Sequence, residues 1–238
     1  MFRGSHPDLG WTMGRAVLRA RELGHPRTGS EHLLLALTTG TDEVAAVLAR
    51  HGATEPAVLD AVCRAAPLGA GVADDRQVLG SLGLDVDRLL EGVTPATLDR
   101  VTWREPLLPL GAAKARRWAA QMRPPMGLDA QAAFEASLRL ALARRERDHR
   151  TEHLAFALTA LDPGAAWTLD TAGVDLAGLL ADLGRSFPPP RRNLILRADR
   201  RLWHRSRHND LVARYQRTTG RTVTSPGALP AVIAGQTM

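Results

Sequence analysis

The chain has 238 residues and a formal net charge of +6, and 45% of its residues are hydrophobic, a balance typical of a folded protein with a sizeable core. The single cysteine, Cys63, excludes an internal disulfide framework and a zinc site built from cysteines. All basic residues except Lys114 are arginines, and no glycine-rich run precedes that lysine. The sequence therefore contains no phosphate-binding loop of the G-x-x-x-x-G-K-[ST] type, and we expect no ATPase of that class.

The positive charge is concentrated at one end of the chain. Residues 186–238 carry ten arginines against Asp199 and Asp210, which gives +8, so residues 1–185 sum to −2. We therefore predict a mildly acidic body, residues 1–185, followed by a basic tail, residues 186–238. No stretch resembles a signal peptide or is long enough for a membrane span, so we expect a cytoplasmic protein without membrane contact.

Helical signals dominate, which predicts an all-α fold, because alanine, leucine and arginine are abundant and strand-length alternation is hard to find. Helix starts are marked by Ser30, Thr41 and Thr54, each expected to act as an N-cap. Cys63 lies in an apolar helix and is expected to be buried. A Gly/Ala/Pro/Asp-rich stretch, 66–75, is predicted to be a loop, and 104–110 a connection. In chain order, the predicted helices span 7–23, 31–39, 42–51, 54–65, 75–82, 85–92, 95–101, 111–122, 129–147, 151–161, 164–172 and 175–184.

An internal repeat emerges when the chain is slid against itself by 121 residues. Six residues from Glu31 to Thr38 then fall on identical residues from Glu152 to Thr159, and Leu48 and Gly52 fall on Leu169 and Gly173. This pattern predicts two units, 7–65 and 128–184, separated by a middle segment, 66–127. Neither unit is expected to bury its apolar face alone, so the two should share one core.

These units resemble the Clp R domain, the N-terminal domain of Clp-type AAA+ unfoldases such as ClpC and ClpA. In the first unit, the resemblance rests on Leu23-Gly24-His25 and on Gly29-Ser30-Glu31-His32-Leu33-Leu34. In the second, it rests on Thr151-Glu152-His153-Leu154, whereas Arg144-Arg145-Glu146 stands where Leu-Gly-His would be expected. The residues expected to carry the structural motif are Gly24, His25, Ser30, His32, Leu33, Thr151, His153 and Leu154.

The resemblance implies a non-catalytic protein-recognition module without the AAA+ motor. Such a module would bind adaptors, peptides or substrates linked to Clp proteolysis, and its partners would be the Clp machinery, adaptors or client polypeptides. In ClpC-type domains, the glutamates of the two motifs take part in recognising phosphorylated arginine, and the matching positions here are Glu31 and Glu152. A carboxylate can accept paired hydrogen bonds from a guanidinium group. A structural alternative is that both glutamates simply favour the first turn of a helix.

His149-Arg150-Thr151-Glu152-His153 also fits the H-x-x-E-H pattern of one class of zinc peptidase. The repeat argues against that reading, because Thr28 stands at the position matching His149. Thr151 is a predicted N-cap, which would place His149 ahead of the helix, whereas zinc-binding histidines need to share a helical face. We therefore expect no catalytic residues, no metal and no cofactor.

The tail is not explained by the resemblance. Residues 193–217 are predicted to include an amphipathic helix, with its apolar stripe against the body or a partner. An alternative function is nucleic-acid binding through 191–221, since arginines interleaved with an aromatic residue can contact phosphates and stack on a base. The residues expected to make those contacts are Arg200, Arg201, Trp203, Arg205 and Arg207. A solvated basic face is the structural alternative.

Overall fold

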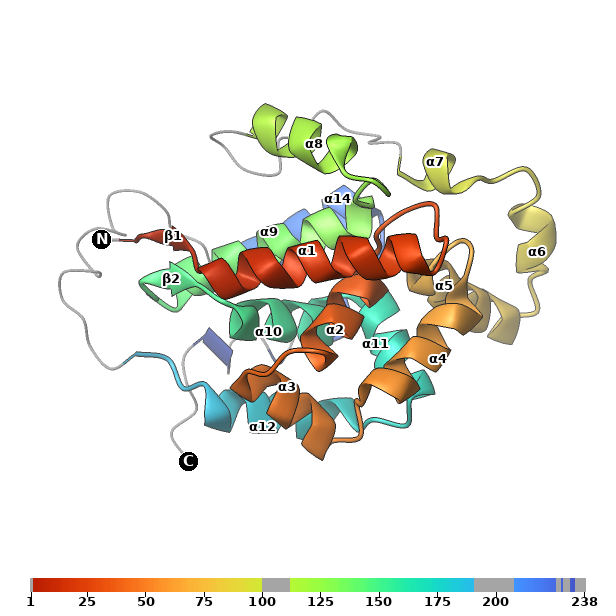
Figure 1. Cartoon of the computed structure of the whole chain (residues 1–238). Coiled ribbons are helices and arrows are strands. Elements are labelled where there is room, and N and C mark those ends of the chain that lie inside the picture. The colour runs from red at the N-terminus through yellow and green to blue at the C-terminus, as the bar shows by residue number, and fades with distance from the viewer. Residues whose placement is uncertain (1, 100–111, 191–207, 226–227, 229–231, 234–238) are drawn as a thin grey trace.

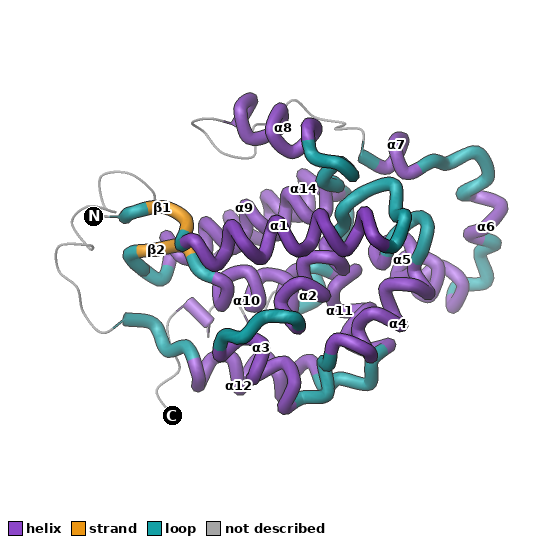
Figure 2. Tube along the Cα trace, viewed as in Figure 1, coloured by secondary structure: helices purple, strands orange, loops and turns teal. Residues whose placement is uncertain are grey.

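The structure is a computed structural model that describes residues 2–99, 112–190, 208–225, 228 and 232–233. The expected all-α class is confirmed: the described residues form helices, apart from two short strands, β1 (Gly4–Ser5) and β2 (Asp148–His149) (Figure 2). Within these residues no single helix is long and apolar enough to cross a membrane, although the helices Ser30–Thr38 and Glu43–Arg50 together pass that test as a pair bent by 97°.

The first eight helices follow the predicted order, with one clear error. They are α1 (Pro7–Glu22), α2 (Ser30–Thr38), α3 (Glu43–Arg50), α4 (Glu55–Ala65), α5 (Ala70–Ser81), α6 (Val86–Leu89), α7 (Pro95–Leu98) and α8 (Ala112–Gln121). The loop predicted over 66–75 is wrong from residue 70 onward, because α5 begins at Ala70. The small residues that suggested a loop, Ala70 and Gly71, are buried with Val72 in a tightly packed first turn. Small side chains allow close helix packing there.

The later helices keep close to the predicted bounds. They are α9 (Leu128–Ala143), α10 (Thr151–Leu161), α11 (Pro163–Thr171), α12 (Leu176–Ser186) and α14 (His208–Thr219). The helix predicted over 129–147 ends earlier than expected, because Arg145 takes a left-handed conformation, φ 62°, and terminates α9. The connection predicted over 104–110 lies outside the described residues.

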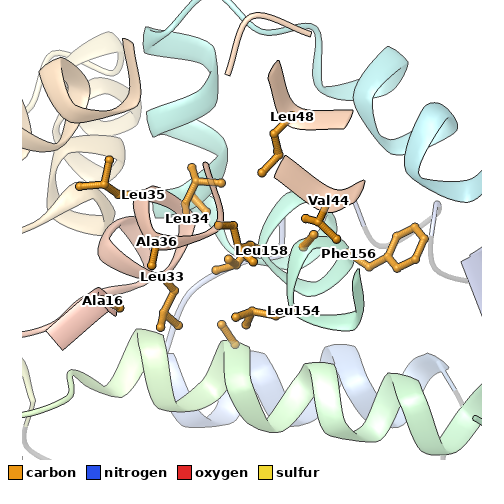
Figure 3. Packing of buried hydrophobic residues seen from close by; sticks show 14 of the residues in the cluster. Ala16, Leu33, Leu34, Leu35, Ala36, Val44, Leu48, Leu154, Phe156 and Leu158 are labelled. Atoms are coloured by element: carbon orange, nitrogen blue, oxygen red, sulfur yellow. The ribbon is translucent and has the colours of Figure 1, made fainter. Parts of the chain in front are cut away.

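The core is centred on α2 and α10. Beyond their polar first turns, both helices are apolar on every side, which favours burial all round. Figure 1 shows α1 and α9 above them and α3 and α12 below. Leu33, Leu34, Leu154 and Leu158 are all at most 1% exposed and lie close together in Figure 3. Each such leucine contributes about 2 kcal/mol of burial free energy, so this contact fixes how α2 and α10 pack.

Two short parallel pairings tie the chain segments together. Ser5 of β1 pairs with His149 of β2, just ahead of α10, and Thr28, ahead of α2, pairs with Met126, ahead of α9. The His6 N–H donates to the His149 carbonyl at 2.8 Å, and the Gly127 N–H donates to the Thr28 carbonyl at 3.0 Å. The segment ahead of α1 is thus held against the segment ahead of α10, and the segment ahead of α9 is held against the segment ahead of α2.

The described part of the tail packs on the body. In α14, Leu211 and Tyr215 are buried against small residues of α9 and α10, which include Ala136 and Ala157. Arg214 pairs with Glu135 on α9, with 2.7 Å between Nη2 and Oε1. The predicted helix over 193–217 corresponds to α14 from residue 208 onward, and residues 193–207 lie outside the described part of the chain.

The expectation that Cys63 is buried is wrong, because its side chain is exposed. The inward stripe of α4 consists of Val58, Ala61, Val62 and Ala65, which follow one another at three- and four-residue spacing. Cys63 falls off that stripe, although its immediate neighbours are apolar.

Candidate functional site

A hollow of about 400 Å³ lies at the connection between α9 and α10, and Glu152 is one of the residues that line it. It is formed by the residue ahead of β1, by that connection and the first turn of α10, and by the chain leaving α12. Figure 1 shows β2, directly ahead of α10, at the end of the molecule opposite α5. Five arginines face three carboxylates, so the lining carries a net positive charge. The lining residues are Arg3, Arg144, Arg145, Glu146, Arg147, Asp148, Arg150, Glu152, Ser186, Phe187, Pro188 and Pro190.

Glu152 supplies a half-buried carboxylate to this hollow from the first turn of α10. Burial raises the pKa of Glu152, and Glu146 adds to that rise, while Arg150 and Arg144 partly oppose it. No residue in the described ranges forms an ion pair with Glu152 within 4.0 Å. A partly dehydrated carboxylate without an ion-pair partner gains strongly from an arriving hydrogen-bond donor, above all a cationic one.

Two of the arginines are committed to the protein itself. Arg3 binds Asp148 through two hydrogen bonds, of 2.9 Å from Nε and 2.7 Å from Nη2. Burial alone would raise the pKa of Asp148, but the hydrogen bonds and charge of Arg3 outweigh it and lower that pKa. Arg144 is 4% exposed, donates to the Phe187 carbonyl and lies 4.9 Å from the Phe156 ring centre. Arg3 and Arg144 therefore shape the wall and floor of the hollow.

Arg145 and Arg147 stand differently, because both side chains are exposed. Within the described residues, neither side chain forms an ion pair or hydrogen bond. Arg145 is also the one non-glycine residue there with a positive φ, of 62°. That conformation at a helix end favours glycine and costs about 1 kcal/mol for another residue. Arg145 and Arg147 are thus free to contact a ligand anion.

Glu31, the other predicted ligand residue, lies in a closed environment and is 1% exposed. Its Oε1 lies 3.1 Å from Nδ1 of His32. Burial alone would raise the pKa of Glu31, but the positive charge of Arg27 and a backbone hydrogen bond act against it, and the pKa of Glu31 lies below its usual value. The structure therefore does not bring Glu31 and Glu152 into one site: one carboxylate is sealed, and the other lines an open hollow.

The motif histidines make matching contacts inside the protein. Nδ1 of His32 accepts the Gly29 N–H at 3.1 Å, and Nδ1 of His153 accepts the Arg150 N–H at 3.1 Å. Because Nδ1 of His32 is an acceptor, its Nε2 carries the hydrogen and donates to Nδ1 of His25 at 2.8 Å. Burial lowers the pKa of His25 and of His153. Leu33 and Leu154, the apolar members of the motif, are both fully buried.

The expected capping roles of Ser30 and Thr151 are wrong by one residue. The N-caps of α2 and α10 are Gly29 and Arg150, because the third helical residue, a histidine, takes up the N-cap N–H. The freed hydroxyls bind aspartates that cap other helices. Ser30 Oγ donates to Asp162 at 2.7 Å, and Thr151 Oγ1 donates to Asp42 at 2.8 Å. Thr41 is also not a cap, since Asp42 caps α3, whereas Thr54 does cap α4.

The H-x-x-E-H pattern is split between two environments. His149 lies in β2, ahead of α10, and its Nε2 is 2.7 Å from Oγ of Ser137. Burial lowers the pKa of His149 to about 3, and the rings of His149 and His153 are 6.1 Å apart. In the described part of the chain, no group of three His, Cys, Asp or Glu side chains is placed to hold a metal ion.

The residues predicted to contact nucleic acid, Arg200, Arg201, Trp203, Arg205 and Arg207, lie outside the described residues. The described tail arginines Arg214 and Arg221 bind carboxylates of the body, Glu135 and Asp75. Sequence reasoning did not single out Arg145 or Arg147. The signal that could have found Arg145 was present, because an arginine replaces the glycine of Leu-Gly-His at a helix end.

Comparisons with family models, with curated proteins and with solved structures each gave no match for this chain.

Proposed function

We propose that this chain forms a non-catalytic module of the Clp R type that binds polypeptide segments at the Glu152 hollow. The observation that carries the proposal is the half-buried Glu152 carboxylate, which has no ion-pair partner among the described residues and faces a net positive lining. Partners would be adaptors or client polypeptides linked to Clp proteolysis, as the resemblance implies.

The helix bounds support a duplicated unit of four helices. The starts and ends of α1 and α9 are separated by 121 residues, and the same holds for α4 and α12. The helices α2 and α10 also start 121 residues apart. Such spacing is expected if one four-helix unit was copied and the two copies share a core. The strand pairings fit as well, because Ser5–His149 and Met126–Thr28 exchange places under that shift.

Backbone details support the same equivalence. Gly24 and Arg145 occupy matching positions and both have positive φ, 69° and 62°. The residues that follow, His25 and Glu146, donate their N–H groups back to the carbonyls of Ala20 and Ala141, at 2.9 and 3.0 Å. The divergent Arg144-Arg145-Glu146 segment thus keeps the backbone turn of Leu23-Gly24-His25 while carrying three charged side chains.

The chemistry of the hollow favours a side chain with both a cationic and an anionic part. Glu152 can accept two hydrogen bonds from a guanidinium group, and Arg145 and Arg147 can donate to oxygens of an attached phosphoryl group. Phosphorylated arginine in a polypeptide combines these features and is the ligand that the resemblance implies. An unmodified arginine would meet Glu152 but also the like charges of Arg145 and Arg147.

Direct binding tests the proposal. A fluorescent peptide that contains one phosphoarginine should bind the full chain, and the variant Glu152→Gln should weaken binding at least tenfold, because it removes one charge from the guanidinium contact. Glu43→Gln is the matched control, since Glu43 is exposed in the first turn of α3. Equal loss in both variants, or no binding by the unmodified chain, would overturn the proposal.

Affinity purification from cell extract separates the proposal from the nucleic-acid alternative. Polypeptide clients or Clp components should be recovered with the full chain and lost with Glu152→Gln. Arg200, Arg201, Arg205 and Arg207 changed together to glutamine should leave that recovery intact. If these changes instead abolish a salt-sensitive nucleic-acid association, the tail alternative is favoured.

A further inference from the structure

The surroundings of Glu31 form a binding site for a guanidinium group that the protein fills with its own Arg27. We infer that this internal occupation silences the Glu31 position, so that the native chain offers one ligand site, at Glu152. The count of ligand sites rests on the proposed function, whereas the guanidinium site itself does not.

Arg27 lies between α1 and α2 and is 5% exposed. Its Nη1 donates to Oδ1 of Asp99 at 2.7 Å, and its Nη2 donates to Oδ2 of Asp129 at 2.6 Å. The carboxylate of Glu31 adds a third negative charge nearby without forming an ion pair: a Cβ atom at Gly69 would lie close to both Oε1 of Glu31 and Nη2 of Arg27. The planar guanidinium of Arg27, which lies between α1 and α2, therefore links this part of the chain to the end of α7 and the start of α9. Each of its two Nη atoms donates to a different carboxylate.

Two glycines let the backbone close around this cation. A Cβ atom at Gly127 would lie 3.0 Å from Cζ of Arg27. A Cβ at Gly69 would lie 3.1 Å from Oε1 of Glu31 and 3.5 Å from Nη2 of Arg27, and Gly69 also has a φ of +92°. Residues with side chains would be crowded at both positions, so the site is shaped for a flat group.

The site also has unused hydrogen-bonding capacity. Oε2 of Glu31 and Oδ1 of Asp129 are buried without a hydrogen-bond partner, and both residues are at most 3% exposed. Buried carboxylate oxygens in this state stabilise a cation strongly and are costly when it is removed. The group that fills the site must therefore be positively charged.

The matching position in the second unit explains why only one site is filled. Asp148 stands 121 residues after Arg27, and its carboxylate is bound by Arg3 and by Arg150. No arginine therefore stands at the position matching Arg27, and the buried guanidinium near Glu152, that of Arg144, donates instead to the Phe187 carbonyl. The exchange of Arg27 for an aspartate is thus one of the differences between the closed position and the open one.

Chemical rescue tests the guanidinium site. Arg27→Ala should lower the thermal unfolding midpoint, and ethylguanidinium at low millimolar concentration should restore most of the loss. Ethylammonium at equal concentration should restore little, because it lacks the planar pair of donors. Arg19→Ala is the control, since Arg19 forms only half-exposed pairs, with Glu22 and Glu55, and should show no rescue. Equal rescue by both compounds, or rescue by neither, overturns the inference.

If Arg27→Ala does not fold alone, refolding with and without ethylguanidinium provides the readout. A larger folded yield with ethylguanidinium than with ethylammonium supports the site, and equal yields reject it. Arg27→Lys adds a second variant, which keeps the charge but loses the fork and should have a lower unfolding midpoint than the unmodified chain. An unchanged midpoint would contradict a guanidinium-specific site.

The ligand count is measured separately on the unmodified chain. Calorimetric titration with the phosphoarginine peptide should give one site per chain. Two equal sites would overturn the silencing of Glu31 even if the rescue succeeds. No binding at all would refute the proposed function but leave the guanidinium site to the rescue experiment.

Discussion

At Arg145, the fold and the proposed function favour different residues: the backbone conformation favours glycine, whereas the proposed ligand contact favours a positive charge. Its left-handed conformation is strained for any side chain with a Cβ atom, and the matching position holds Gly24. Arg145→Gly should therefore stabilise the fold by about 1 kcal/mol, while weakening the binding of the phosphoarginine peptide several-fold through loss of a positive charge. Urea unfolding and peptide titration of the same variant measure the two effects.

The control for this prediction is Arg145→Lys, which keeps the charge and the strain. It should leave stability unchanged and retain part of the binding. A gain in stability without any loss of binding on Arg145→Gly would show that Arg145 has only a structural role.

Asp162 should make stability depend on pH. Its carboxylate accepts the Ala165 N–H at 2.6 Å and the Ser30 hydroxyl at 2.7 Å, and the Tyr215 hydroxyl donates to it as well. Burial and the nearby charge of Asp129 outweigh these bonds and raise the pKa of Asp162 from 3.8 to about 6. Because the folded state holds this proton more tightly, the contribution of Asp162 is fully present below pH 3.8 and is lost as pH rises through 6.

The measurement is urea unfolding of the unmodified chain and Asp162→Asn between pH 4.5 and pH 7.5. The unmodified chain should lose stability relative to the variant as pH rises, by up to about 2 kcal/mol between these two pH values. The comparison cancels the opposite contribution of Glu31, whose lowered pKa favours folding above its usual range. A difference that is constant or grows with pH would contradict the account of Asp162.

For single residues, the sequence predicted which residues belong to the two motifs better than it predicted what surrounds them in the fold. The two motif glutamates are indistinguishable in a pattern that sees Glu-His-Leu twice. Their environments differ because Arg27, Gly69 and Asp99 close over Glu31, and these contacts join residues far apart in the chain. Only the replacement of Gly24 by Arg145 in the second unit hinted that the two positions would differ.

Among the elements, α14 contributes to the stability of the body. Leu211 is 1% exposed and packs against α9 and α10. Leu211→Ala should lower the free energy of unfolding by about 2–4 kcal/mol, because it leaves a cavity at that contact. Gln216→Ala, at an exposed position of the same helix, should change it by less than about 0.5 kcal/mol. Similar small effects in both variants would mean that α14 is not docked in solution.

Element prediction succeeded where local signals agreed and failed where packing decided. The bounds of α10 match the predicted 151–161, because a polar first turn precedes a run of apolar residues and a proline follows. The start of α5 was missed, since Pro67, Gly69 and Gly71 are local signals for a loop. Its first turn is held by close packing on α11, where a Cβ at Gly164 would lie 2.8 Å from the Gly71 nitrogen. That approach cannot be read from a local window.

For the whole molecule, the uneven charge has a structural counterpart. Arg214 and Arg221 of the basic tail bind Glu135 and Asp75 of the acidic body, so part of the tail charge is used to dock the described tail segment. Composition predicted the all-α class. It did not predict that Ser5 would pair with His149 and Thr28 with Met126, because these pairings join segments that lie far apart in the chain.

The central claim is that the chain recognises polypeptides at Glu152 and not at Glu31, and hydrogen–deuterium exchange with and without the phosphoarginine peptide tests it most directly. The account predicts slower exchange in residues 144–152 and at Ser186 and Phe187, which line the hollow, and no change around residues 25–31. Slower exchange around Glu31, or a change that avoids 144–152 altogether, would contradict it.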